Sequence, residues 1–482
     1  MVGPMVIPAR DWIRTSDAPL ARLIRAARRF STRRGAIHSD GSITAAMDRT
    51  VATAIGGDPA TPGPGATPDR IDSRRRRTRD RPLIVAVSSY PVAPRRGGGP
   101  IRAWHLLTAL AAHADVDVEI VSTRPAGPEV EASRLSERVT ETTVRLSDAH
   151  TAAESRLRLL TGHVAITDIG LSCLWPSSPE LVHRLRGALD EAVAALHVQP
   201  YLATAVHELA GDLPTICDEH NHELGLKSGI LPDNEGGRWL MRRVEETERL
   251  ATSGARLVTA TTDADLASIC ADYGVASDVA AVVPNGVDTS ATAFVTGEAR
   301  RTAGRELRRR FELTSDHVAV FVGSGHGPNT DAGRTIVALA PELPDVTFVL
   351  AGRHSDALRG RRLPHNVRLL GTISDADLDL LLSGADLALN PIATGGGSNI
   401  KLVTYLAAGL PVVSSALGAR GINAAAAGIV VSDAGEEADA IRGILAEGGA
   451  RGSTGRAYVV THCDWRGIGA RFSALVQEHL PT

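Results

Sequence analysis

The sequence contains almost no lysine. Of its 52 basic residues, only Lys227 and Lys401 are lysines, and the rest are arginines. Heavy use of Arg, Ala and Gly indicates a coding bias against lysine, so a lysine inside a motif-like segment gains weight as a selected point charge. Chance is the alternative. Aromatic residues make up 3% of the 482 residues, so the core is expected to be mostly Ala, Val, Leu and Ile.

Cysteines are also few, and no apolar run is long. The four cysteines lie far apart and form no CxxC pair, which is typical of reduced core residues in a cytoplasmic protein: Cys173, Cys217, Cys270 and Cys463. No run reaches the about 20 apolar residues that cross a bilayer. No secretory signal pattern is recognisable. The net charge of -3 argues against a general nucleic-acid binder.

Residues 1–80 differ in composition from the rest of the chain. They contain the Pro/Gly-rich stretch GGDPATPGPGATPDR and the arginine run SRRRRTRD, which predict a disordered extension. Residues 18–30 have an apolar helical face and four arginines. This segment could make a peripheral contact with the inner face of an anionic membrane. A flexible extension with no membrane role is the alternative.

Two successive sets of alternating strands and helices follow. The first starts at RPLIVAVSSYP, and the second starts after VPNGVDT with the strand HVAVFVGS. This order predicts an α/β protein with two doubly wound, Rossmann-like domains. We expect an N-terminal domain at residues 81–290 and a C-terminal domain at 291–460.

The stretch GGGSNIKLVTYLAAGLPVVSS, residues 395–415, is typical of a phosphate site. Glycines let backbone amides approach a phosphate, and helix N-termini and fixed cations stabilise its charge. Lys401 falls in the first turn of the helix expected here. A plain glycine-rich turn with a solvated lysine is the alternative. The residues that precede or begin this helix are Gly395, Gly396, Gly397, Ser398 and Asn399.

Three further segments follow predicted strands, where open α/β sheets bind ligands. Gly97, Gly98 and Gly99 follow the first strand, and RRGGGP lacks the GxGxxG spacing of a nicotinamide site. A tight turn is the alternative there. His220 lies in DEHNHE, where helix capping with surface histidines is the alternative. The segment PNG, with Asn285 and Gly286, follows the last strand of the first set, and an ordinary turn would look the same.

Five segments in order resemble the retaining glycosyltransferases of the GT-B fold, close to family 4. They are VVPNGVDT, VFVGSGHGPNTDAGRTIV with VTFVLAG, LLGTISDADLDLLLSGADLALNP, IKLVTYLAAGLPVVSS and HCDWRGIGARFSALV. The resemblance covers about residues 82–480. It implies that the two domains face each other across a cleft and that residues 461–482 form a closing helix that returns to the first domain. It implies a glycosyltransferase that moves a sugar from a nucleoside-diphosphate sugar to an unidentified acceptor. It further implies retention of anomeric configuration, no metal and no separate cofactor.

The resemblance also assigns roles to residues. The transferred sugar and the diphosphate are expected at His220 and Lys401. The expected acceptor cleft contains Gly97, Gly98, Gly99, Asn285 and Gly286. The expected donor site contains Gly395, Gly396, Gly397, Ser398, Asn399, Thr404, Ser324, His326, Thr372 and Ile373.

Two departures from the family pattern affect the donor site. The family carries Arg and Lys after the first strand of the second domain, where this chain has GSGHGPN; His326 or backbone amides would have to serve there. The family's two glutamates fall at Gly396 and Thr404. Losing a charge-assisted bond to the ribose weakens donor binding about ten- to a hundred-fold. The missing residues make a non-catalytic nucleotide-sugar binder an alternative. A nucleotide-sugar epimerase built on the same double-Rossmann plan is another.

Overall fold

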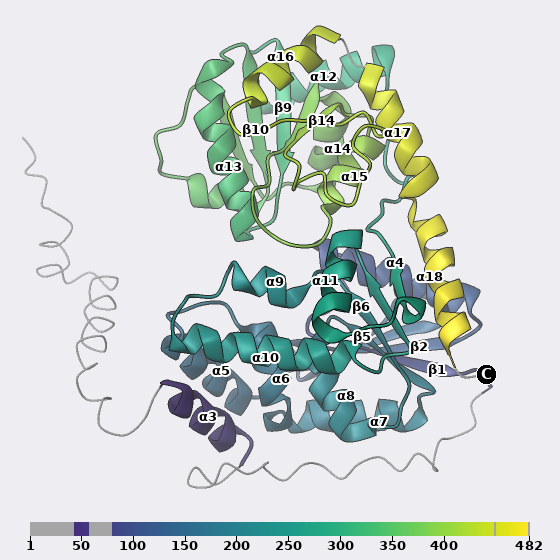
Figure 1. Cartoon of the computed structure of the whole chain (residues 1–482). Coiled ribbons are helices and arrows are strands. Elements are labelled where there is room, and N and C mark those ends of the chain that lie inside the picture. Colours follow the sequence, from purple (N-terminus) through teal and green to yellow (C-terminus); the bar gives the residue numbers. More distant parts are fainter. Residues whose placement is uncertain (1–42, 57–79, 448–449, 481–482) are drawn as a thin grey trace, which may run out of the picture.

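The structure is a computed structural model that describes residues 43–56, 80–447 and 450–480. Figure 1 shows two lobes, one above the other, each built around a sheet. The final two helices run down one side and connect the upper lobe to the lower one. The described part of the chain therefore has the two-domain α/β architecture that the alternating pattern predicts.

The N-terminal domain contains an eight-stranded sheet in the order β3-β4-β2-β1-β5-β6-β7-β8. All neighbouring pairs are parallel except β3 and β4, which pair antiparallel. The hairpin of β3 and β4 was not predicted, because its polar strands VEASR and VTETTVR carry no apolar run. The strands are β1 Leu83–Ser88, β2 Asp117–Arg124, β3 Val130–Arg134, β4 Val139–Arg145, β5 Ala194–Val198, β6 Thr215–Glu219, β7 Leu257–Ala260 and β8 Ala280–Val282.

Helices cover both faces of this sheet. Alternate residues of β1 point to opposite sides, so Ile84 packs with helices α4 and α18, and Val85 packs with α7 and α8. This explains why β1 reads as a continuous apolar run. The helices of this lobe are α4 Gly98–His113, α5 Asp148–Leu160, α6 Thr167–Leu174, α7 Pro179–Glu191, α8 Ala203–Ala210, α9 Glu223–Ser228, α10 Glu235–Thr252, α11 Asp263–Tyr273 and α18 Trp465–His479.

The C-terminal domain contains a six-stranded parallel sheet in the order β11-β10-β9-β12-β13-β14. The strand order reverses between β9 and β12, the kind of position where doubly wound sheets bind ligands. The strands are β9 His317–Val322, β10 Val346–Ala351, β11 Val367–Gly371, β12 Leu387–Asn390, β13 Val412–Ser414 and β14 Val430–Val431. The helices are α12 Gly297–Phe311, α13 Gly327–Leu339, α14 Asp375–Gly384, α15 Ile400–Ala407, α16 Glu437–Glu447 and α17 Ala450–His462.

Two chain segments cross between the domains and pair with each other. Val287 and Asp464 form a parallel β-bridge, and the Val287 amide donates to the Cys463 carbonyl at 2.8 Å. Gly286 allows this approach, since a Cβ there would lie 2.8 Å from the Cys463 carbonyl oxygen. The helix α18 then packs against α4. The crossing segments therefore form one paired connection between the two lobes.

The expectation that residues 1–80 are disordered is wrong for helix α3, Ile43–Ala54. Met47 is fully buried in a cluster with Trp239 of α10, and the Trp239 indole donates to Asp48 Oδ1 at 2.8 Å. The composition of residues 1–80 did not indicate this helix, because α3 is stabilised by packing against the N-terminal domain rather than by its own sequence. The predicted membrane segment, residues 18–30, lies outside the described residues. Among the described helices, none has the length and apolar character that crossing a bilayer requires.

Candidate functional site

The glycine loop before α15 presents unpaired backbone amides. Between Gly395 and Asn399, no backbone N–H donates to an acceptor among the residues that the structure describes. The Asn399 side chain does not cap the helix, because its Nδ2 donates to the Gly418 carbonyl at 3.1 Å. The hydroxyl oxygen of Ser398 is buried and has no hydrogen-bond partner in the described part of the chain. Such a run of free donors is a ready site for an anion.

Lys401 stands beside this loop without an acidic partner. Its ammonium donates to Asn329 Oδ1 and lies 5.0 Å from the centre of the Phe321 ring. No described carboxylate forms an ion pair with it. Burial lowers the pKa of Lys401 to about 8. A desolvated cation held only by neutral groups is arranged to gain from an anionic ligand.

Three helix N-termini meet where the two domains face each other. A Cβ on Gly98, in the first turn of α4, would contact Ile400 of α15 at 3.4 Å, and one on Gly395 would contact Pro328 of α13 at 3.5 Å. None of α4, α13 and α15 has an acidic residue in its first turn or a side-chain cap. By contrast, α5, α10, α11 and α14 carry both. The three uncapped termini leave positive partial charges unneutralised in one region.

His220 lies between Tyr90 and Asp218 and is buried. Its Nδ1 is 3.3 Å from the Tyr90 hydroxyl, its Nε2 is 3.4 Å from Asp218 Oδ2, and the residue is 8% exposed. A Cβ on Gly99 would meet the Tyr90 hydroxyl, so this glycine permits the arrangement. The contact between His220 and a sugar stays a prediction.

The carboxylate that contacts His220 belongs to a buried ion pair between Arg102 and Asp218. Arg102 of α4 is 1% exposed, and its Nε and Nη2 donate to the two Asp218 oxygens at 2.9 and 2.5 Å. Burial alone would raise the pKa of Asp218, but Arg102 and His220 hold it well below its ordinary value. Arg102 Nη1 also donates to the Val283 carbonyl at 2.8 Å. The helix that follows the first glycine loop is thereby tied to the segment that leaves the domain.

The N-terminal domain contacts the C-terminal glycine loop directly. Asn285 Nδ2 donates to the Ser398 carbonyl at 3.2 Å. A Cβ on Gly396 would lie 3.1 Å from the Asn221 side chain, and one on Gly397 would lie 2.5 Å from the His220 carbonyl oxygen. A side chain at position 396 would therefore require Asn221 to shift by a few tenths of an ångström.

The remaining predicted donor residues lie along the carboxyl edge of the C-terminal sheet. Asn329 Nδ2 donates to Ser324 Oγ at 3.1 Å, which joins the loop after β9 to Lys401 through one amide. His326 is the exposed residue that precedes α13. Thr404 donates its hydroxyl to the Ile400 carbonyl at 3.0 Å and remains half-buried. Thr372 is exposed and Ile373 half-buried, directly after β11.

Sequence analysis missed four residues of this region: Asn221, Asn329, Arg102 and Arg420. Arg420 follows β13 and donates through Nε to the Gly397 carbonyl at 3.0 Å. Arg102 and Asp218 are 116 positions apart, so no local pattern marks the pair. Asn221 beside His220 and Asn329 at the end of GSGHGPN did have a usable signal, because both segments had already been singled out.

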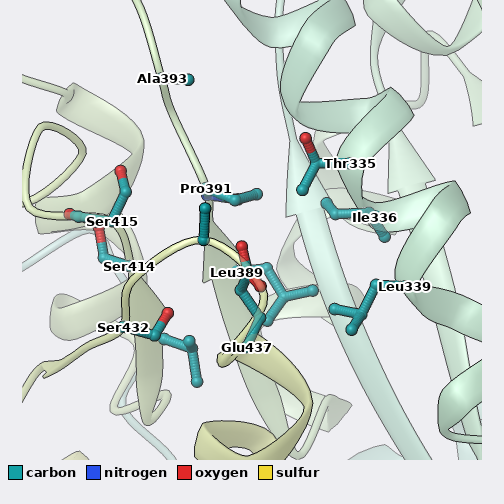
Figure 2. A pocket seen from close by; sticks show the side chains of 12 residues that line it. Thr335, Ile336, Leu339, Leu389, Pro391, Ala393, Ser414, Ser415, Ser432 and Glu437 are labelled. Atoms are coloured by element: carbon teal, nitrogen blue, oxygen red, sulfur yellow. Dashed lines mark hydrogen bonds between the residues drawn. The ribbon is translucent and has the colours of Figure 1, made fainter.

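The described residues also form a small cavity of about 120 Å³, whose lining includes Ala393, two residues before the glycine loop. Figure 2 shows that α13 supplies one wall through Ile336 and Leu339, while Leu389, Ser415 and Ser432 lie opposite. The cavity lies on the face of the sheet covered by α13 and α16 and includes none of the predicted site residues. No group of three or more His, Cys, Asp or Glu residues within the described ranges is placed to hold a metal ion.

Two family models match the chain, one over each domain. Residues 96–291 match a model described as Glycosyltransferase Family 4, and residues 316–447 match one described as Glycosyl transferases group 1. The chain belongs to the group 1 glycosyltransferases of GT-B fold. This confirms the predicted glycosyltransferase family and the predicted fold class, whereas retention of configuration stays a prediction. A search of curated protein sequences finds no match.

Solved structures share the GT-B fold of this group 1 glycosyltransferase. Sucrose-phosphate synthase from Thermosynechococcus elongatus is 19% identical, with a TM-score of 0.63 over 83% of this chain and 99% of that one. HepE from Anabaena, solved in complex with UDP-glucose, is 15% identical, with a TM-score of 0.56 over 82% and 99%. Trehalose 6-phosphate synthase from Burkholderia multivorans is 16% identical, with a TM-score of 0.55 over 83% and 98%.

Proposed function

We propose that this group 1 glycosyltransferase transfers a glycosyl group from a nucleoside-diphosphate sugar to an acceptor with retention of configuration. The observation that carries the proposal is the run of free amides from Gly395 to Asn399 beside Lys401, a cation without a carboxylate partner. Breaking the glycosidic bond places negative charge on the diphosphate. Preorganised donors and a fixed cation stabilise that charge as it develops.

In this proposal the two domains have separate tasks. The C-terminal domain would hold the diphosphate at the glycine loop, with Lys401 following the leaving group as a compact charge. The N-terminal domain would present the acceptor near Tyr90 and the first turn of α4. In the proposed reaction, the acceptor oxygen bonds to the anomeric carbon, the bond to the diphosphate breaks, and a leaving phosphate oxygen takes the acceptor proton. The steps of this proposed reaction use no metal and no separate cofactor.

The structure of HepE, which was solved with UDP-glucose, supports a nucleotide sugar as donor, since HepE has the same fold. The identity of 15% leaves the base, the sugar and the acceptor of the present enzyme open to measurement. A cytoplasmic location and a membrane contact through residues 18–30 remain proposals. So does the expectation that nucleic acid is not a partner.

One observation favours a second candidate, a non-catalytic nucleotide-sugar binder. Thr404 stands where the family has the glutamate that binds the donor ribose, and its hydroxyl already donates to the Ile400 carbonyl. A weakened donor site is compatible with binding without transfer. The two candidates differ in turnover, because a binder would leave the donor intact.

The test is incubation of the purified full chain with UDP-, GDP- and ADP-sugars, with donor loss and nucleotide release followed by mass spectrometry. We expect slow hydrolysis of at least one donor, and the anomeric configuration of the released sugar, read by NMR at early times, to match that of the donor. A thermal shift with a donor but no hydrolysis would favour the binder. No shift and no hydrolysis with any donor would refute both.

A further inference from the structure

The glycine loop is held by Arg420, a residue of the loop between β13 and β14. The Nε and Nη2 of Arg420 both donate to the Gly397 carbonyl, and Nη2 makes a longer contact of 3.5 Å with the Gly395 carbonyl. Arg420 forms no ion pair with any described carboxylate. Its guanidinium is therefore committed to backbone oxygens of the predicted phosphate site.

We propose that Arg420 is a positioning residue for the donor diphosphate, one that acts through the backbone of the glycine loop. The proposal rests on the function proposed above and deepens it. The N–H and C=O of a trans peptide group point in opposite directions. Fixing the Gly397 carbonyl on Arg420 therefore directs the Ser398 amide away from Arg420. The contact with Gly395 does the same, more weakly, for the Gly396 amide.

The segment that carries Arg420 is itself fixed at several points. The Gly418 amide donates to Ser415 Oγ at 2.9 Å, and the Gly418 carbonyl accepts bonds from Asn390 and Asn399. Gly421 packs against Ser398 and against Thr262 of the other domain. The segment that carries Arg420 is therefore held in place by hydrogen bonds of its own, independently of the bonds that Arg420 makes to the glycine loop. Neither Arg420 nor Lys401 forms an ion pair with a carboxylate in the described part of the chain, so two cations without such a partner serve this region.

The chain offers a matched control in Arg300. This half-buried arginine also donates to backbone carbonyls, at 3.1 Å to Ala385 and 2.6 Å to Ala408. It ties α12 to the segment after α14 and to the C-terminal end of α15, the opposite end of that helix from the glycine loop. Arg300→Gln therefore removes a comparable set of bonds without removing a bond to the glycine loop itself. Arg420→Lys keeps the charge and a single donor nitrogen, but it cannot donate to the Gly397 carbonyl from two nitrogens as Arg420 does.

The experiment measures inorganic pyrophosphate binding by calorimetry for the full-length wild type, Arg420→Gln, Arg420→Lys and Arg300→Gln. We expect Arg420→Gln to weaken binding by about tenfold or more, with partial rescue by Arg420→Lys. Arg300→Gln should lower the thermal midpoint and leave affinity unchanged. Wild-type affinity in Arg420→Gln, or an equal loss in Arg300→Gln, would overturn the proposal.

Hydrogen exchange of the ligand-free protein, read in peptides that cover residues 395–407, distinguishes the role proposed for Arg420 from the proposed glycosyltransferase function. Faster exchange in Arg420→Gln, with no pyrophosphate binding by the wild type, would refute the proposed function and show that Arg420 still orders the loop. Unchanged exchange together with retained pyrophosphate binding would refute the role of Arg420 alone. If a transferable donor is found, the KM for that donor should rise in Arg420→Gln more than kcat falls, a split that a general loss of stability would not produce.

Discussion

The ammonium of Lys401 donates a hydrogen bond to Asn329, a neutral amide, and this lysine forms no ion pair with a described carboxylate. The other lysine has the opposite environment, since Lys227 contacts both Asp168 and Glu223. Burial lowers the pKa of Lys401, whereas the two carboxylates raise the pKa of Lys227 against the effect of burial. The charge of Lys227 is thus paired with carboxylates of the fold, whereas the charge of Lys401 can pair with an anionic ligand.

Replacing Lys401 should not weaken the ligand-free fold. Lys401→Met removes a desolvated charge but keeps an apolar chain over Phe321, so we expect the free energy of unfolding to stay equal or rise by about 1–3 kcal/mol. Lys227→Met leaves Asp168 and Glu223 without their cation and should cost about 1–3 kcal/mol. Urea denaturation of both variants measures the difference. Equal destabilisation by the two substitutions would show that Lys401 has a structural role.

The lowered pKa of Lys401 also implies that the stability of the fold and the affinity for a nucleoside diphosphate depend on pH. Its folded pKa is about 8, below that of an unfolded lysine, so its destabilising effect is full below pH 8 and disappears as the pH rises toward the unfolded pKa. The stability of the wild type should therefore approach that of Lys401→Met across this range. Nucleoside-diphosphate affinity should fall about tenfold per pH unit above pH 8 in the wild type only. A fall of the same slope in Lys401→Met would assign the effect to another group.

Gly397→Ala should impair domain contact more than stability. At φ +63°, alanine is strained by about 1 kcal/mol, and its Cβ would meet the His220 carbonyl. Gly274 has φ +68° with nothing near the position of a Cβ, so Gly274→Ala carries the strain without the collision. We expect similar thermal midpoints for the two variants, with donor turnover lowered at least about tenfold only in Gly397→Ala. Equal turnover would mean that the domain contact at Gly397 is not needed for the reaction.

Met47 of α3 should contribute to the stability of the N-terminal domain. Met47→Ala opens a cavity beside Trp239 and should cost about 2–5 kcal/mol. Val460→Ala, at a side chain that is 49% exposed, should change stability by less than about 0.5 kcal/mol. Chemical denaturation followed by tryptophan fluorescence compares them. A negligible effect of Met47→Ala would mean that α3 does not stay packed in solution.

The fold could be predicted from the sequence because buried parallel strands read as apolar runs, as in LIVAVS of β1 and VTFVLA of β10. The antiparallel pair of β3 and β4 escaped detection, because one side of each strand is polar and the strands pair at the sheet edge. Helix α3 escaped for a different reason. Its burial against α10 depends on a contact across 191 positions, between Asp48 and Trp239.

The glycine loop and Lys401 could be recognised because their residue types alone suit an anion at a helix N-terminus. The groups that hold them in place could not. Arg420 is one of many arginines, and only its bonds to the Gly397 carbonyl distinguish it. The absence of a glutamate at position 396 was visible, but the close approach of the Asn221 side chain to this position depends on the arrangement of the two domains.

The most direct test of the diphosphate site is a calorimetric titration of UDP, GDP and ADP into the wild type and Lys401→Met at pH 7. We predict that at least one nucleoside diphosphate binds the wild type and that Lys401→Met weakens this binding about ten- to a hundred-fold, while the variant stays folded. Equal affinity in both proteins, or no binding of any of the three to the wild type, would contradict the account.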